Sequence, residues 1–119
     1  ALAALASLVA ILWYGKLGLK KLALTNYQRA EYLKNLLKEI PGVKQLNEGQ
    51  TFNEFAVRLH ADEKRVEQIF RQEGIAPGLN LGRYFTELNG YLLVAVTEVK
   101  SKQQLEHYAQ VAKNLMSGK

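Results

Sequence analysis

The chain has 119 residues, enough for one domain with a hydrophobic core of its own, and it contains no cysteine. The lack of cysteine excludes disulfides, thiolate metal sites and cysteine catalysis, and it fits a cytoplasmic protein. The net charge of +5 lies on residues 16–44, which hold seven basic and two acidic residues. No aromatic residues are interleaved with these charges on one face, so we interpret them as a solvated helix face and expect no nucleic-acid partner.

Residues 1–15 carry no charge. They are shorter than the about 20 apolar residues that a membrane-spanning helix needs, and they lack the basic leader and starting Met of a signal peptide. A helix that is apolar on all sides is normally buried by its neighbours. We therefore expect residues 1–18 to be the end of a helix from a preceding large domain, residues 19–119 to form a small α+β domain, and no membrane partner. When excised, the helix over residues 1–14 is expected to cause self-association.

Gly15 and Gly18 are expected to separate this helix from a second one over residues 19–40, which Pro41 stops. The apolar residues of the second helix recur at steps of three and four, which places them on one face. They are Ala23, Tyr27, Ala30, Leu33, Leu37 and Ile40. Lys34 falls outside this stripe and is expected on the polar side.

Three segments have the pattern of strands. Residues 43–46 are expected to form a short strand, and residues 54–59 alternate between apolar and polar, as in a strand with one covered face. Residues 91–96 are apolar at every position, without alternation. Such a strand is typically covered on both faces, so we expect it at the centre of the sheet.

Two further helices have recognisable ends. One is expected to start at Asp62 as N-cap and to stop just before Gly74. The last helix starts with a capping box formed by Ser101 and Gln104. The element order is then α-α-β-β-α-loop-β-α, which predicts an α+β fold with a small, mostly antiparallel sheet and helices packed on it.

The loop over residues 74–90 is rich in Gly, Pro and Asn, which indicates a specific backbone path, and it carries an isolated arginine, Arg83. A guanidinium on such a loop can bind a carboxylate, either from a substrate or from a facing domain. The alternative is an internal salt bridge from Arg83 to Glu87 or Glu98 that holds the loop in place.

The neighbours of Arg83 are the other candidate contact residues. Tyr84 follows it directly, and Glu98 is expected to end the central strand. We take Arg83, Tyr84 and Glu98 as possible contacts for a substrate carboxylate or an interface, although packing is the simpler role for Tyr84 and Phe85.

No residues form a catalytic pattern. His60 and His107 lack companions at metal-ligand spacing, so a surface or capping role is expected for both. Gly78 and Gly82 are four residues apart without a strand-to-helix fingerprint around them, which is a weak phosphate-loop signal. We therefore assign no catalytic, cofactor-binding or metal-binding residue.

Several stretches together resemble a known family. They are Phe52-Asn53-Glu54-Phe55, Glu73-Gly74-Ile75, Leu81-Gly82-Arg83-Tyr84 with Glu87-Leu88, Leu92-Leu93-Val94-Ala95-Val96-Thr97-Glu98, and Gln28-Arg29-Ala30-Glu31-Tyr32-Leu33. Their order and spacing resemble the carboxyl end of glycine dehydrogenase (decarboxylating) subunit 1, the first chain of the split P-protein of the glycine cleavage system. The chain departs from the family pattern at Ala76-Pro77, where members tend to have glycines, and at Thr86, where they tend to have Pro.

The resemblance implies the small carboxyl-terminal domain of a fold-type-I pyridoxal-phosphate enzyme. In that family glycine is decarboxylated on the cofactor, and its aminomethyl group passes to the lipoyl arm of H-protein. The cofactor lysine belongs to subunit 2, the partner chain in a heterotetramer, so this chain alone is expected to bind no cofactor and to be inactive.

Two other functions remain open from the residues alone. The first is a free-standing α+β regulatory domain that binds a small molecule at the Gly-rich loop. The second is a peripheral membrane or nucleic-acid module that uses residues 16–44.

Overall fold

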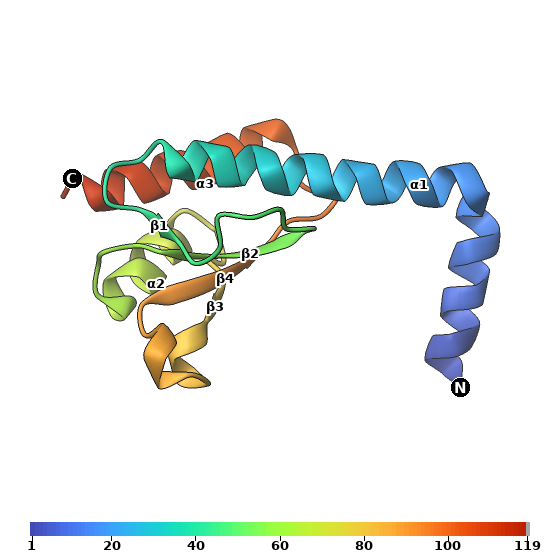
Figure 1. The fold of residues 1–119 in the computed structure, drawn as a ribbon, viewed down its shortest axis with the longest axis horizontal. Helices are drawn as coiled ribbons and strands as arrows, with labels where there is room; N and C mark the ends of the chain where they lie inside the picture. The colour runs from blue at the N-terminus through green and yellow to red at the C-terminus, as the bar shows by residue number, and fades with distance from the viewer. Residues whose placement is uncertain (119) are drawn as a thin grey trace.

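The computed structural model describes residues 1–118, and its elements follow the expected order with one additional strand (Figure 1). The helices are α1 (Leu2–Lys38), α2 (Glu63–Gln72) and α3 (Lys102–Met116); the strands are β1 (Lys44–Gln45), β2 (Glu54–Arg58), β3 (Leu79–Asn80) and β4 (Tyr91–Ala95). Two 3-10 turns, η1 (Leu81–Arg83) and η2 (Thr86–Leu88), lie between β3 and β4. The strands form one antiparallel sheet in the order β1-β2-β4-β3, which confirms the α+β prediction.

Helix α1 is divided by a kink at Gly15, where the backbone has φ 64° and ψ −178°. Positive φ is accessible to glycine without steric cost, so this residue turns the chain sharply between two helical segments (Figure 1). We call residues 2–14 the arm. The expected second break at Gly18 is wrong, because Gly18 lies inside the helix that resumes after Gly15.

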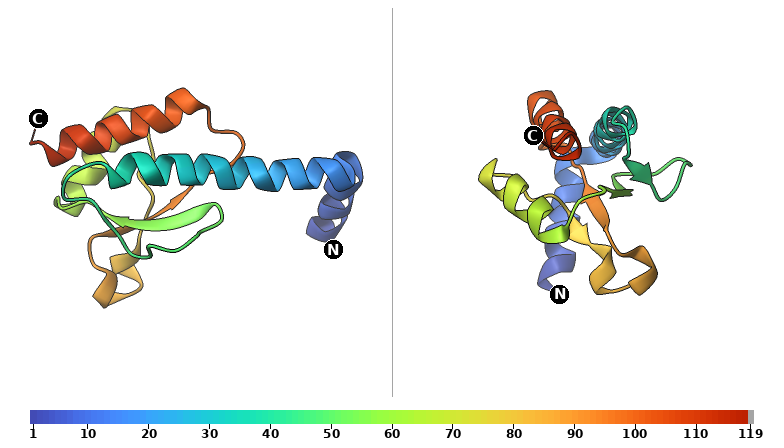
Figure 2. Two further views of the ribbon diagram at one scale, coloured as in Figure 1. Left: turned by 45° about the horizontal axis from the view of Figure 1, so that its top comes forward. Right: turned by 90° about the vertical axis from the view of Figure 1, so that its left-hand side faces the viewer.

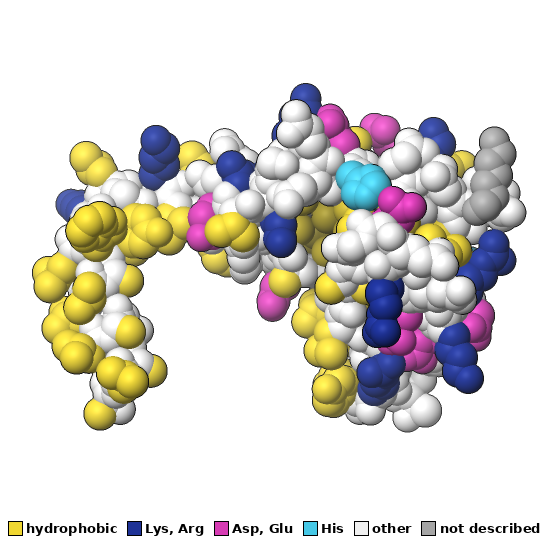
Figure 3. All heavy atoms as spheres, turned by 180° about the vertical axis from the view of Figure 1, so that it is seen from behind, with side chains coloured by type: hydrophobic (Ala, Val, Ile, Leu, Met, Phe, Trp, Pro, Cys, Tyr) yellow, Lys and Arg dark blue, Asp and Glu magenta, His cyan; other side chains and the backbone are white. Residues whose placement is uncertain are grey.

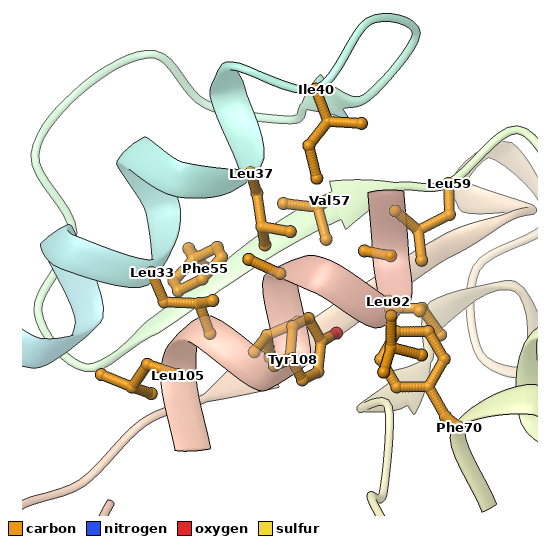
Figure 4. Packing of buried hydrophobic residues seen from close by; sticks show 14 of the residues in the cluster. Leu33, Leu37, Ile40, Phe55, Val57, Leu59, Phe70, Leu92, Leu105 and Tyr108 are labelled. Carbon is orange, nitrogen blue, oxygen red and sulfur yellow. The ribbon is translucent and has the colours of Figure 1, made fainter. Parts of the chain in front are cut away.

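The part of α1 after the kink and α3 lie side by side on one face of the sheet (Figures 1 and 2). The predicted stripe of the first of these helices is buried at Ala30, Leu33, Leu37 and Ile40. Ala23, nearer the kink, is exposed, because α1 extends beyond the sheet there. The stripe of α1 packs against β2 residues such as Phe55 and Val57 in one continuous core (Figure 4).

Helices α2 and α3 start and pack as their sequences predict. The Asp62 side chain accepts hydrogen bonds from the first turn of α2, and Ser101 and Gln104 form the expected capping box of α3. The Phe70 and Tyr108 rings meet with their centroids 4.9 Å apart, which joins the two helices in the core (Figure 4).

Strand β4 is central, as predicted, but the described residues cover only one of its faces. Leu92 and Val94 point into the core, whereas Leu93 is half-buried and Ala95 is exposed. Both long helices lie on the core side of the sheet (Figure 2). The expectation that both faces are covered is therefore wrong for residues 1–118, since no second helical layer is present there.

Lys34 differs most from its predicted position on the polar side of α1, because it is only 5% exposed. Its ammonium donates to the Gly49 carbonyl at 2.7 Å and to the Thr51 hydroxyl at 3.3 Å, and lies 3.5 Å from the Glu31 carboxylate. The Lys34 carbonyl accepts a hydrogen bond from the Gln45 side chain at 2.9 Å. Lys34 thus ties the segment between β1 and β2 to α1.

We expect Lys34→Met to lower the free energy of unfolding by about 1–3 kcal/mol, because the Gly49 carbonyl loses its buried donor. Lys38→Met, on the exposed side of the same helix, is the control and should change it by less than about 0.5 kcal/mol. Urea unfolding measures both. Equal midpoints for the two variants would show that the Lys34 contacts contribute nothing.

Candidate functional site

Arg83 lies on η1 and is held by two carboxylates of α2. Its guanidinium is 2.8 Å from Glu63 Oε1 and 2.7 Å from Glu67 Oε1. The two acceptors are four residues apart, so they lie on one face of the helix. The prediction of an internal salt bridge is correct in kind, but the predicted partners, Glu87 and Glu98, are wrong. We call this group of three side chains the Arg83 clamp.

The clamp is electrostatically satisfied. Hydrogen bonds from Arg83 and then from Asn80 lower the pKa of Glu63 below its usual 4.5, and Glu63 in turn raises the pKa of Arg83. The buried Asn80 side chain also accepts a hydrogen bond from the Gly82 amide at 2.8 Å, which fixes the start of η1. Because one guanidinium faces two carboxylates, this arrangement does not attract a further anion.

Tyr84 and Phe85 follow the clamp and are 67% and 51% exposed. Within residues 1–118 these two side chains do not pack in the core, so the expected packing role is wrong there. They lie between η1 and η2, in the connection that projects from the sheet in Figure 1. Two aromatic side chains on a clamped turn are suited to contact another protein surface.

Glu98 is not brought to Arg83. It lies beyond the end of β4, and its backbone carbonyl accepts a hydrogen bond from Arg29 of α1. Arg29 also donates to the Lys100 carbonyl at 2.7 Å, so it ties the connection between β4 and α3 to α1. In the sequence, Arg29 is one of the seven basic residues of the segment 16–44. No local pattern reveals its role, because its acceptors are about 70 residues away.

A cleft of about 580 Å³ opens between residues 73–79, β4 and α3. Its walls are mostly apolar, with Leu33 and Leu105 from the two helices and Ile75 from the loop. His107 and Glu73, both among the lining residues, approach to 3.4 Å. Sequence reasoning missed this cleft because its walls come from five segments that are distant in the sequence, namely α1, β2, residues 73–79, residues 93–96 and residues 100–108.

Gly78 and Gly82 serve the chain's own packing. Gly78 has φ 138°, and a Cβ there would lie 2.6 Å from the Leu93 carbonyl oxygen of β4. A Cβ at Gly82 would lie 3.0 Å from Asn89 Cα. Both glycines therefore allow a close approach of backbone to backbone that a side chain would prevent, so their spacing has a structural explanation.

The histidines do not form a metal site. His60 is exposed just after β2, and His107 pairs with Glu73 on another element. Within residues 1–118, no group of three or more His, Asp or Glu side chains could hold a metal ion.

The arm is apolar and exposed. Trp13 is 86% exposed and Leu12 73% exposed, and hydrophobic side chains cover the arm in Figure 3. Within the described chain, α1 is the one helix long and apolar enough to cross a membrane, which is weak evidence because core helices and signal sequences pass the same test. The arm before the Gly15 kink measures roughly 20 Å, less than the about 30 Å of a hydrocarbon core.

Comparisons with known proteins agree with one another. The chain matches the family model described as glycine cleavage system P-protein over residues 1–112. It is 54% identical over 115 residues to the probable glycine dehydrogenase (decarboxylating) subunit 1 of Protochlamydia amoebophila, covering 97% of this chain and 26% of that protein. With the protein of the same name from Halalkalibacterium halodurans it shares 43% identity over 110 residues, covering 92% of this chain and 24% of that protein.

A solved structure shows the same relationship. The chain superposes with a TM-score of 0.76 and 27% identity on the crystal structure of glycine decarboxylase (P-protein) of the glycine cleavage system, in inhibitor-bound form. The match covers 88% of this chain and 24% of that one. The chain thus spans about a quarter of the length of the relatives it matches.

We expect Arg83→Ala to loosen the turn over residues 81–89 without changing the unfolding midpoint, because the clamp is solvent-exposed. Amide hydrogen exchange should become faster at Phe85, whose amide bonds to the Leu81 carbonyl. Arg71→Ala, on the helix α2 that carries Glu63 and Glu67, is the control.

The clamp also predicts a pH dependence. Because the pKa of Glu63 is lowered in the folded state, its contribution is present above the usual pKa of 4.5 and is lost as the pH falls through the lowered value. The protection of the turn should therefore decrease in that acidic range. The quantity to compare is the protection of the Phe85 amide relative to an unprotected amide at the same pH. Unchanged protection, both in Arg83→Ala and in acid, would contradict the role of the clamp.

Proposed function

The chain belongs to the glycine cleavage system P-protein family, and we propose that it is the carboxyl-terminal domain of a glycine dehydrogenase (decarboxylating) subunit 1. The whole enzyme would decarboxylate glycine with pyridoxal phosphate and transfer the aminomethyl group to lipoylated H-protein. The observation that carries this proposal is the 54% identity to a protein of that name over 97% of the chain. Subunit 2, in a cytoplasmic heterotetramer, is the proposed partner.

The residues of this chain do not fit a pyridoxal-phosphate site of their own. The Gly78 and Gly82 backbone is packed against other chain segments, and the charge of Arg83 is balanced by two carboxylates. Lys34, the buried lysine, is engaged by the Gly49 carbonyl. We therefore derive no catalytic step from this chain, and we propose, as the family resemblance implies, that the partner subunit binds the cofactor.

The role that this chain supports is that of an interface. Fully burying a large apolar side chain stabilises by about 1.5–3 kcal/mol, and residues 2–14 expose a whole helix of such side chains. In the whole subunit we expect the arm to pack against a preceding large domain. The aromatic pair Tyr84 and Phe85, held by the Arg83 clamp, is proposed as the second contact at a domain or subunit seam.

One observation favours the alternative of a small-molecule-binding regulatory domain. The cleft beside the Gly-rich loop, at about 580 Å³, lies within the range of about 300–1,000 Å³ that small-molecule sites occupy. In that case the protein would bind its ligand without carrying out the glycine reaction.

The first test is the glycine-dependent exchange of labelled bicarbonate, with pyridoxal phosphate and H-protein. We expect activity only when the full-length protein is mixed with its partner subunit. Activity of the full-length protein alone would place the cofactor lysine in the same chain and contradict the two-subunit proposal. No activity in either case would favour the regulatory domain.

In the active mixture, Arg83→Ala should weaken assembly or raise the KM for glycine. If neither changes, the proposed contact of the Arg83 loop at a domain or subunit seam is refuted.

The arm generates a separate prediction. Isolated residues 1–119 should self-associate, because nothing in the described chain covers the side chains of residues 2–14. Residues 16–119, which lack the arm, are the matched control and should stay monomeric. Light scattering over a range of concentrations measures both, and a concentration-independent monomer mass for residues 1–119 would rule out association through the arm.

A further inference from the structure

Within the described residues 1–118, one edge of the central strand has no partner inside the cleft. Strand β3 pairs with β4 only at Leu92 and Leu93, so the chain moves away from β4 before Ala95. On the other edge, the Val96 amide donates to the Asn53 carbonyl of the segment before β2 at 2.8 Å. Hydrogen bonding alternates along an antiparallel strand, so the amide and carbonyl of Ala95 point away from β2, toward the cleft.

The structure also shows why β3 cannot continue along this edge. The register that pairs Leu79 with Leu93 would place Pro77 opposite Ala95, and proline has no amide to donate. The Tyr108 hydroxyl of α3 donates to the Pro77 carbonyl at 2.6 Å, which occupies the acceptor that could have served β4. Burial raises the pKa of this Tyr108 phenol, so it remains a donor.

The surroundings of this edge suit an extended peptide. The cleft of about 580 Å³ is lined mainly by apolar side chains and by the backbone of residues 74–78. Its charged lining residues are of both signs, with Glu54 and Glu73 against Lys100, and Glu73 lies 3.4 Å from His107. The lining therefore carries at most one net negative charge, too little to select a charged ligand over an apolar one. Natural proteins normally cover an unpaired strand edge, because its free amide and carbonyl can pair with any extended chain.

We propose that the edge of β4 at Ala95 accepts an extended segment of the same polypeptide, from the part of the full-length subunit outside residues 1–119. The segment would add to the sheet as a short strand in the place that Pro77 cannot take, with apolar side chains in the cleft. The relatives are about four times as long as this chain, so most of the polypeptide is available for this contact. Because the segment belongs to the same polypeptide, its binding is intramolecular and does not depend on the concentration of a free partner.

Amide hydrogen exchange in the full-length subunit tests the hydrogen bond at this edge. We expect the Ala95 amide to exchange at least about 100-fold more slowly than an unprotected amide. Val94 and Val96 are internal controls, because their amides face β2 in either case. Unprotected exchange at Ala95, with Val94 and Val96 protected, would overturn the proposal. This proposal rests on the length of the relatives and not on catalysis. A failure in the hydrogen-exchange measurement is therefore distinguishable from a failure of the proposed function, which the bicarbonate-exchange assay tests.

A photoreactive residue at Leu79 identifies the occupant. Leu79 lines the cleft and is about half exposed, so the replacement should leave the core intact. In the full-length subunit mixed with its partner, we expect crosslinks to a segment of the same polypeptide outside residues 1–119. Crosslinks to the partner subunit, or none, would overturn the assignment to the same chain. A photoreactive residue at Leu46, next to β1 at the opposite edge, is the control and should not label the same segment.

Discussion

A four-stranded sheet has two faces, and the described residues of this chain supply helices for only one of them. The part of α1 after the Gly15 kink and α3 bury the core face, including Val57 and Val94. The opposite face keeps Leu93 and Ala95 partly or fully exposed. The exposed arm and the free edge of β4 reflect the same constraint, because each is an apolar or hydrogen-bonding surface that needs more protein than residues 1–118 provide.

Three basic side chains hold the connections of this fold. Lys34 binds the segment before β2, Arg29 binds the segment after β4, and Arg83 binds α2. Two of the three come from residues 16–44, the segment that carries the excess charge. Their charges are directed to carbonyl and carboxylate oxygens of the chain itself, which leaves fewer of them for a nucleic-acid or membrane surface.

In our proposal the chain is one part of an enzyme, and it contributes contact surfaces and not catalytic groups. The chain corresponds to about a quarter of the length of its relatives. The glycines and the arginine that the sequence offered as binding-site candidates have structural partners within the chain. Gly78 and Gly82 allow close backbone approach, and Arg83 holds a turn that presents Tyr84 and Phe85. The features that still need an explanation are therefore the exposed apolar surfaces and the free edge of β4. In our proposal they are interfaces of the larger protein.

Local patterns in the sequence determined most of the helices and strands, and the order and spacing of several motifs indicated the family. The stripe through Leu33 and Leu37 and the capping box at Ser101 were correct, because periodicity and end-capping depend on neighbours within one or two turns. Only the tertiary structure decided that Lys34 is buried and that Arg83 pairs with α2, since those contacts join residues 15–20 positions apart. The open edge at Ala95 likewise depends on where Tyr108 places Pro77, 31 residues away in the sequence. Such contacts have no local signature, because they exist only once the sheet and its helices are packed together.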